Sequence, residues 1–464
     1  MTRILYWNIQ DFSINKILNP VTNKRKRGSA VSEHAASLDR RQLILQNLTE
    51  NTPQIFVVVE VSTAAGAAGS VITGGGANGT WKLLEEMRAA AALAPPPLAE
   101  WCVVPPLTSG TGGFAEGIAV FYDASALHFV GPYKWPGAGP AVPMTAAGAA
   151  TDYLPPFFNP LRIGVFANAL PNRTVPLASP LNGGAQESHL AGQFQFLPAA
   201  GGGPLQFPGP NNRTPFLTAF YDPVGARIIT LLAMHTTPAV AAGGMTALGN
   251  VTEMTSAPLL AGGPEVQVVV GDFNVSLWAA GAGAAYGTLT APAPGPGYAQ
   301  AITLGTYAGG NVPPDNGYFI THIKPGNNAK PWVGAYQGNN FGYPGYDYMG
   351  SAPMFPGYDA IDNIFYRYIG TPPPAAHNTT IVNRVVGSPY NNPDRLPLPV
   401  GLPQGALGYL ASAPPPVPVP AAGPPVTQGG YAPGTVGGLK SFKGWNKYGK
   451  IRSTSDHLAI VIDV

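Results

Sequence analysis

The sequence has little charge and only one cysteine. Asp, Glu, Lys and Arg make up 10% of the 464 residues, and the formal net charge is +2. A balance so close to zero excludes a polyanion partner recognised by overall charge, so any basic surface must be local. Cys102 is the single cysteine, which excludes an intrachain disulfide framework and a cysteine-based zinc site.

Long hydrophobic runs are also missing. No uninterrupted apolar stretch approaches the roughly 18 residues that a membrane-spanning helix needs. Residues 1–13 contain no basic region followed by a long apolar region and a small-residue cleavage site. The sequence therefore predicts a soluble protein that is either cytoplasmic or exported without a visible signal peptide.

Glycine, proline and apolar residues are abundant instead. The chain has 59 Gly and 52 Pro, and 45% of its residues are hydrophobic, enough for a sizeable core. Gly, Pro, Ala and Asn dominate residues 131–216, 277–355 and 371–438. Loops this long are uncommon inside a compact domain unless they are functional or disordered. We therefore expect one domain over residues 1–464, with these three segments as insertions.

Apolar patterning predicts the regular elements. Runs rich in Val, Ile, Phe and Tyr are typical of buried strands, and they span residues 3–9, 55–61, 117–122, 227–235, 266–273, 360–368 and 457–464. Residues 32–54 and 79–94 have helical spacing, with Ser32 as the expected N-cap of the first. Residues 243–263 predict a weaker third helix. Strands and helices alternate early in the chain, and longer loops follow.

Polar side chains stand at the ends of nearly all these strands. They are Asn8, Glu60, His235, Asp272, Asn274, Asp362, Asn363, Asp456 and His457. One such residue alone is usually a turn former or a cap. Strand ends and the loops after them also carry chemistry, however. Six strand ends could therefore converge on one cleft.

Four of them suit a metal ion and a phosphate group. Glu60 and Asp456 offer the oxygen ligands that Mg²⁺ prefers in proteins. Asn8 and Asn274 could donate hydrogen bonds to phosphate oxygens without adding repulsive negative charge. No Gly-rich Walker pattern is present, so a nucleotide-binding loop is not expected.

The other strand-end residues suit proton transfer. His235 and His457 could move protons near neutral pH. Carboxylates such as Asp272 or Asp362 could orient them. A metal ion, an acid–base pair and neutral donors together indicate hydrolysis of a phosphate ester.

The chain resembles the endonuclease/exonuclease/phosphatase superfamily, which is typified by deoxyribonuclease I and by abasic-site nucleases of the exonuclease III type. The matching blocks, in the family's order, are YWNIQDF, VVVEV, GIAVFYD, LLAMHTTP, VVVGDFNVS, YDAIDNIFYR and STSDHLAIVIDV. The resemblance implies a four-layer α/β sandwich of two packed mixed β-sheets flanked by helices. It implies an active site at one edge of the sandwich.

The resemblance also implies roles for individual residues. Glu60 is similar to the family's principal metal carboxylate, with Asn8 and Asp456 nearby. His457 resembles the histidine that contacts the scissile phosphate, oriented by Asp362. The expected metal is Mg²⁺, with Mn²⁺ or Ca²⁺ as alternatives.

Other positions help to separate branches of the family. Asp272 and Asn274 resemble the pair that positions water and phosphate, and His235 resembles the second acid–base histidine of the deoxyribonuclease I branch. Many abasic-site enzymes have an acid where this chain has Gln10, although Asp11 follows. The inositol-phosphatase branch has Cys-Asp-Arg in the block near Asp362, and this chain lacks it. Both departures argue against those branches.

Two basic segments favour a nucleic acid substrate. Residues 24–27 read KRKR, and residues 440–452 interleave five basic residues with Phe, Trp and Tyr just before the Ser-Asp-His block. Basic groups can neutralise backbone phosphates, for which we single out Lys443 and Lys447, and rings can stack on bases. The aromatic, Gly-rich residues 336–359 are a second candidate for stacking.

The sequence therefore predicts a divalent-metal-dependent phosphodiesterase, an endonuclease that cuts DNA with modest sequence preference. One alternative is a phosphoesterase on a lipid or phosphoinositide, similar to a sphingomyelinase. Another is a non-catalytic binding or structural protein on the same scaffold, with its long insertions used for assembly.

Overall fold

The computed structural model describes the parts of the chain that form its two sheets, their helices and the joining turns. These are residues 1–18, 30–64, 66–93, 99–134, 142–143, 158–172, 176–177, 185–193, 207–208, 213–251, 264–277, 281–292, 295–303, 321–323, 358–374, 379–382, 399–400, 426–427 and 454–464.

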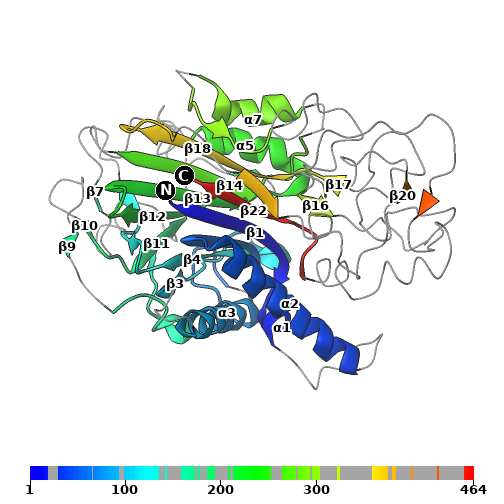
Figure 1. The fold of residues 1–464 in the computed structure, drawn as a ribbon. Coiled ribbons are helices and arrows are strands. Elements are labelled where there is room, and N and C mark those ends of the chain that lie inside the picture. Colours follow the sequence, from blue (N-terminus) through cyan, green and yellow to red (C-terminus); the bar gives the residue numbers. More distant parts are fainter. Residues whose placement is uncertain are drawn as a thin grey trace.

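Six strands form the first sheet, in the order β19-β22-β1-β2-β4-β3 (Figure 1). They are β1 (Arg3–Phe12), β2 (Ile55–Ser62), β3 (Trp101–Val104), β4 (Glu116–Asp123), β19 (Thr379–Val382) and β22 (Ala459–Asp463). β1 and β2 run parallel, whereas β22 and β4 pair antiparallel with β1 and β2 respectively. The first and last strands of the described chain are therefore neighbours in one sheet.

The second sheet has the order β15-β18-β14-β13-β12-β11-β8, and β5 also pairs with β12. Its strands are β5 (His128–Phe129), β8 (Phe158–Pro160), β11 (Leu190–Gln193), β12 (Phe216–Asp222), β13 (Arg227–His235), β14 (Glu265–Asp272), β15 (Ala299–Gln300) and β18 (Asp362–Ile369). β13 and β14 run parallel, and β18 pairs antiparallel with β14. This sheet is mixed, like the first.

Helices flank the two sheets on their outer sides (Figure 1). They are α1 (Ile14–Ile17), α2 (Ala30–Asn51) and α3 (Gly75–Ala92) beside the first sheet, and α5 (Ala241–Gly249) and α7 (Ala282–Thr290) beside the second. The predicted fold of two packed mixed sheets flanked by helices is confirmed. Within the described ranges, no helix is long and apolar enough to cross a membrane.

The core lies between the sheets and under the helices. β1 contacts β14 and β2 contacts β13 across the interface, so the two parallel pairs face each other. Buried apolar side chains of both sheets form one continuous cluster. Because each sheet is covered on both faces, a strand such as β2, IFVVVEVS, is apolar along its length and shows no alternation.

The close packing of α3 on β2 depends on a glycine. A Cβ added at Gly76 would lie 1.7 Å from the carbonyl oxygen of Ser62, at the end of β2. Only a residue without a side chain allows the helix to approach the strand so closely. Gly76 therefore helps to hold the end of β2, where Glu60 lies.

The seven runs expected to be strands are β1, β2, β4, β13, β14, β18 and β22. Two of the expected helices appear as α2 and α3, and α5 covers the described part of the third. The prediction that Ser32 caps the first helix is wrong, because α2 begins at Ala30. Its apolar pattern starts later than the helix itself.

The segments expected to be insertions contribute to both sheets. β8 and β11 lie within residues 131–216, β15 and α7 within 277–355, and β19 within 371–438. The sequence pattern does not reveal these elements, because short strands that pair with long ones carry little periodicity of their own. The remaining small elements are β6 (Tyr133–Lys134), β7 (Val142–Pro143), β9 (Pro176–Leu177), β10 (Ala185–Gln186), β16 (His322–Ile323), β17 (Tyr358–Asp359), β20 (Pro399–Val400), β21 (Val426–Thr427), η1 (Gly112–Phe114), η2 (Gly164–Phe166) and η3 (Pro238–Val240).

Candidate active site

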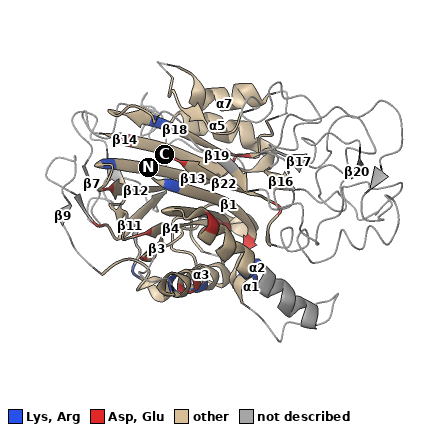
Figure 2. Ribbon diagram, viewed as in Figure 1, with Lys and Arg blue, Asp and Glu red and all other residues tan. Residues whose placement is uncertain are grey.

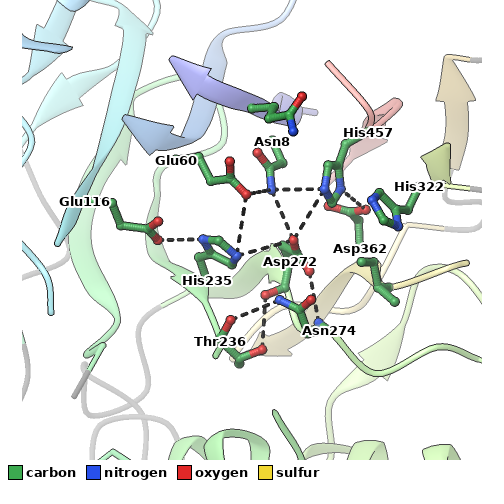
Figure 3. A network of polar contacts seen from close by, with 12 residues as sticks. Asn8, Glu60, Glu116, His235, Thr236, Asp272, Asn274, His322, Asp362 and His457 are labelled. Atoms are coloured by element: carbon green, nitrogen blue, oxygen red, sulfur yellow. Dashed lines mark hydrogen bonds and ion pairs between the residues drawn. The ribbon is translucent and has the colours of Figure 1, made fainter. Parts of the chain in front are cut away.

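Polar side chains from both sheets meet at one edge of the sandwich (Figure 3). Charged residues are sparse along the described ribbon (Figure 2), so a buried polar cluster is conspicuous. The two parallel pairs bring their carboxyl ends to this edge, and antiparallel β18 begins there opposite the end of β14. The predicted site residues brought together are Asn8, Glu60, His235, Asp272, Asn274, Asp362, Asp456 and His457.

Asn8 lies at the centre of the cluster and is fully buried. Its Nδ2 donates to Glu60 Oε1 at 3.0 Å and to Asp272 Oδ2 at 3.1 Å, and it lies 3.3 Å from His457 Nε2. Glu60 belongs to the first sheet and Asp272 to the second. One amide therefore joins the polar ends of both sheets.

Each of the two predicted histidines is held by its own carboxylate. His457 Nδ1 lies 2.8 Å from Asp362 Oδ2, and His235 Nδ1 lies 2.6 Å from Glu116 Oε1. These contacts leave the Nε2 atoms to face a common group. His235 Nε2 is 3.5 Å and His457 Nε2 is 3.6 Å from Asp272 Oδ2. Two imidazoles, one at the end of β13 and one just before β22, thus converge on one carboxylate oxygen (Figure 3).

The electrostatics of the cluster favour protonated histidines. Burial alone would lower the pKa of His457, but Asp362 and Asp272 outweigh it and raise the pKa to about 10. For His235, burial likewise acts to lower the pKa, and Glu116 with Asp272 raises it to about 9. Both side chains therefore carry a proton at neutral pH when no cation is bound.

The two carboxylates between these histidines differ in acidity. Burial and repulsion from Asp362 raise the pKa of Asp272 to about 6. Burial would also raise the pKa of Glu60, but the charges of His235 and His457 and the hydrogen bond from Asn8 hold it below its usual range. Glu60 is therefore a firmly ionised carboxylate, whereas Asp272 titrates close to neutral pH.

The backbone at the site is strained at the residues that carry function. Glu60 has φ 59° and Asn274 has φ 51°, in the left-handed region that side chains other than glycine seldom occupy. The β2–β4 register shifts between Val58 and Val61, which marks a bulge around Glu60. Bulges re-aim a side chain next to functional sites, and strain of this kind clusters there.

This strain predicts an unusual order of stability at position 60. In an ordinary strand, glycine is less stable than alanine by about 0.5–1 kcal/mol. The left-handed conformation costs alanine roughly 1–2 kcal/mol that glycine avoids. The Glu60→Gly protein should therefore be more stable than Glu60→Ala by about 1 kcal/mol in urea denaturation. A Glu60→Ala protein that is the more stable of the two would contradict the strain.

Hydrogen bonds fix the segment that carries His457. The backbone N–H of His457 donates to Ser455 Oγ at 2.9 Å, and Ser455 Oγ donates to the carbonyl oxygen of Asn8. Trp7 Nε1 donates to the carbonyl oxygen of His457 at 2.8 Å. Tyr6 supports the imidazole indirectly, because its hydroxyl donates to Oδ1 of Asp362, the carboxylate partner of His457, at 2.8 Å. The imidazole is thus oriented through both its backbone and its carboxylate partner.

Asn274 is oriented by the strand end before it. Its backbone N–H donates to Asp272 Oδ1, and its Nδ2 donates to the carbonyl oxygen of Thr236, both at 3.0 Å. These bonds lock Asp272 and Asn274 into one unit. Asp11, which follows the departure at Gln10, contacts Glu60 through its backbone N–H at 3.2 Å, while Asp11 itself is exposed.

The structure adds residues that the sequence pattern did not single out. Glu116 lies at the start of β4, before the apolar run 117–122, whereas most of the polar residues singled out from the sequence follow their apolar runs. Arg213 contacts both Glu116 Oε2, at 3.1 Å, and His235 Nδ1, at 2.9 Å. The ring of His322 lies 4.4 Å from the ring of His457, centroid to centroid. His322 lies within residues 277–355, the Gly-rich segment expected to be an insertion.

Some predicted contacts lie outside the described residues. They include Lys443 and Lys447, the basic residues 24–27 and 440–452, and the aromatic loop as far as residue 357. Their roles in substrate binding stay predictions.

The cluster fits the divalent cation that the family resemblance implies. Glu60, Asp272 and His457 each offer a ligand atom, and these atoms lie within 4.8 Å of one another. Asn8 Oδ1 is buried and has no hydrogen-bond partner among the described residues. A buried acceptor without a donor is costly, and a cation would satisfy it. Glu60 and Asn8 are therefore the residues best suited to hold the ion.

Comparison with known proteins gives matches only among solved structures. No protein-family model and no curated protein matches the chain. Zebrafish TDP2 in complex with a single-strand DNA product has 10% identity and a TM-score of 0.37, over 99% of this chain and 97% of that chain. The human Nocturnin catalytic domain with bound sulfate has 11% identity and a TM-score of 0.36, over 100% and 93%.

A third match is described as an endonuclease/exonuclease/phosphatase family protein from Leptotrichia buccalis, with 11% identity and a TM-score of 0.37, over 100% of this chain and 99% of that chain. Similarity at this level says nothing by itself about activity or substrate. In its sequence motifs and its two packed mixed sheets, the chain resembles the endonuclease/exonuclease/phosphatase superfamily.

Proposed function

We propose that the protein is a divalent-metal-dependent phosphodiesterase and that its substrate is DNA, which it cuts as an endonuclease. The observation that carries the proposal is the convergence of His235 and His457 on Asp272 Oδ2, at 3.5 Å and 3.6 Å. The Glu60 carboxylate and the buried Oδ1 of Asn8 offer oxygen ligands for the cation beside these groups. Such a set can transfer protons and neutralise charge during an in-line displacement at phosphorus.

The pKa values of Asp272, His457 and His235 suit these groups to different roles in the reaction. A bound divalent cation supplies positive charge to the phosphate oxygens and lowers the pKa of a bound water. Asp272, whose pKa is raised to about 6, accepts the proton of the attacking water. His457 donates a hydrogen bond to a non-bridging phosphate oxygen, and His235 gives its proton to the leaving oxygen as the P–O bond breaks. Asn274 holds the water and phosphate in line.

The carboxylates that contact the histidines keep both imidazoles protonated. Asp362 and Glu116 raise the pKa values of His457 and His235 well above 6.5. The imidazoles therefore enter the reaction protonated, as an acid and an electrostatic stabiliser must.

DNA is favoured over other phosphodiesters by two features. Residues 440–452, with Lys443 and Lys447, precede His457 closely in the sequence and can neutralise backbone phosphates. Among the described residues, Phe114 is 62% exposed, and its carbonyl oxygen accepts a hydrogen bond from Arg213 Nη2, beside His235. An exposed ring near the site can stack on a base.

Supercoiled plasmid cleavage tests the proposal. The full chain should convert supercoiled DNA to nicked circles in Mg²⁺ or Mn²⁺, and excess chelator should stop the reaction. His457→Ala protein, purified in the same way, serves as the control for contaminating nucleases.

Parallel assays with sphingomyelin and phosphoinositides separate the remaining candidates. Metal-dependent release of phosphate or phosphocholine without nicking would replace DNA with a lipid substrate. Inactivity on all three substrate classes would overturn the enzymatic proposal and favour a binding protein on this scaffold.

A further inference from the structure

A second group of possible ligands lies beside the proposed catalytic centre. We propose that His322, Asp456 and His457 form a separate site for a transition-metal ion, with Zn²⁺ as the best fit. The site shares His457 with the catalytic centre but does not include Glu60 or Asn8. Zinc and the phosphate would therefore compete for the same imidazole nitrogen.

The three side chains already present ligand atoms to one another. His322 Nε2 lies 3.7 Å from Asp456 Oδ2, and His457 Nε2 lies 3.9 Å from Asp456 Oδ1. One ligand atom from each residue lies within 4.8 Å of the other two. In a tetrahedral zinc site with bonds of about 2.0–2.1 Å, the ligand atoms are about 3.3 Å apart. Shifts of well under 2 Å would complete the geometry.

The ligands are buried and come from fixed backbone. The side chains of His322 and Asp456 are each 12% exposed, and that of His457 is 5% exposed. His322 and His457 face each other across an isolated antiparallel bridge. The next residue along, Leu458, donates its N–H to the carbonyl oxygen of Thr321 at 2.7 Å. Thus two segments that are distant in the sequence hold the imidazoles together (Figure 3).

A carboxylate behind one ligand supports metal binding. Asp362 Oδ2 lies 2.8 Å from His457 Nδ1, which orients the ring and leaves Nε2 for the ion. Metal-binding histidines commonly have such a partner, and it increases the basicity of the ligand nitrogen. Thr321 Oγ1 accepts the backbone N–H groups of Ile361 and Asp362, so the supporting carboxylate is tied to the segment that carries His322.

The donor set distinguishes this position from the one at Glu60. Two imidazoles and one carboxylate suit Zn²⁺, with a fourth position left for water. Mg²⁺ prefers oxygen ligands and keeps several waters. The structure therefore offers a hard cation position at Glu60 and Asn8, and a nitrogen-rich position on the other side of His457.

Zinc binding by the full chain, measured without substrate, tests the site. Competition with a chromophoric chelator should show a zinc ion that wild type binds at least about 100-fold more tightly than His322→Phe does, since even a partner behind a ligand contributes 10- to 100-fold. Phenylalanine keeps a ring against His457 and removes the ligand nitrogen. His128→Phe is the matched control, because His128 pairs with Glu187 away from the site. Equal affinity in wild type and His322→Phe would overturn the proposal.

Cobalt provides a measurement that needs no variant. Co²⁺ bound by two imidazoles and a carboxylate with four or five ligands should give strong visible absorption, and one equivalent of Zn²⁺ should abolish it. Only the weak absorption of octahedral cobalt would overturn the site, even if His322→Phe failed to fold.

Inhibition of catalysis by zinc rests on the proposed function. Its result can be distinguished from the result of the zinc-binding experiment. If the protein is a Mg²⁺-dependent nuclease, zinc should inhibit wild type at fixed Mg²⁺ in proportion to occupancy of the site. Zinc bound by wild type and not by His322→Phe, in a protein that cuts no DNA, would support the metal site and count against the nuclease.

Discussion

Replacing His457 with alanine should slow metal-dependent DNA nicking by about 10²- to 10⁴-fold, the usual contribution of a positioned acid–base group. The imidazole lies 2.8 Å from Asp362 and 3.6 Å from Asp272, so its loss removes the positive charge that would face the phosphate. The measurement is the initial rate of nicking at saturating Mg²⁺, with the folded state checked by circular dichroism.

Two further variants test whether the loss of activity is specific to the pair of His457 and Asp362. Asp362→Asn keeps the size of the side chain and removes its charge, so it should also lose at least about 10²-fold, as when the orienting acid of a triad is changed to an amide. His128→Ala breaks another histidine–carboxylate pair, with Glu187 at 2.8 Å, and should leave the rate close to that of wild type. Equal losses in His128→Ala and His457→Ala, or no loss in His457→Ala, would contradict the assigned role.

The Asn8→Asp protein should be less stable than wild type by about 3 kcal/mol in chelator at pH 7, the low end of the cost of an uncompensated buried charge, because the protonated His457 Nε2 lies 3.3 Å from the substituted nitrogen and offsets part of the repulsion. Asn8 is fully buried and donates to Glu60 and Asp272. Aspartate has nearly the same shape, but it loses both donated bonds and places a third negative charge between two carboxylates. The cause is therefore electrostatic.

The pH dependence separates repulsion from poor packing. The new carboxyl group should be protonated in the folded state at pH 4, so the deficit in the free energy of unfolding should be small there and grow as the pH rises. Urea denaturation followed by circular dichroism measures it, and divalent cation should restore part of the loss at pH 7. Asn250→Asp, at an exposed helix end, is the control. A deficit that does not change with pH would point to packing instead.

The parts of this molecule that the sequence predicted are those with strong local signals. β2 and β14 contain the apolar runs IFVVV and VVV, and Glu60 and Asp272 follow these runs with groups that are costly to bury. Such residues can be singled out without knowing their partners. That they meet follows from the packing of the two parallel pairs on each other, with β1 against β14 and β2 against β13.

Other parts depend on partners that are distant in the chain. The two-residue β15 is a strand only because it pairs with β18, and the Ala- and Gly-rich α7 lacks the amphipathic pattern that marks a surface helix. Glu116 acquires its role from His235, 119 residues later. His322 stands in a segment with no periodic signal, and only its bridge to His457 brings it to the site. Pairing of this kind is a property of the folded chain.

The placement of β22 beside β1 has a consequence for biosynthesis. Asn8 and His457 are 449 residues apart in the sequence and in contact in space. A ribosome-bound chain that has not yet released β22 can hold Asn8, Glu60 and Asp272, but it has no His457. β22 inserts between β19 and β1, so the reactive centre is complete only after this late strand has docked. Chains that end before His457 would therefore lack one of the two imidazoles that converge on Asp272.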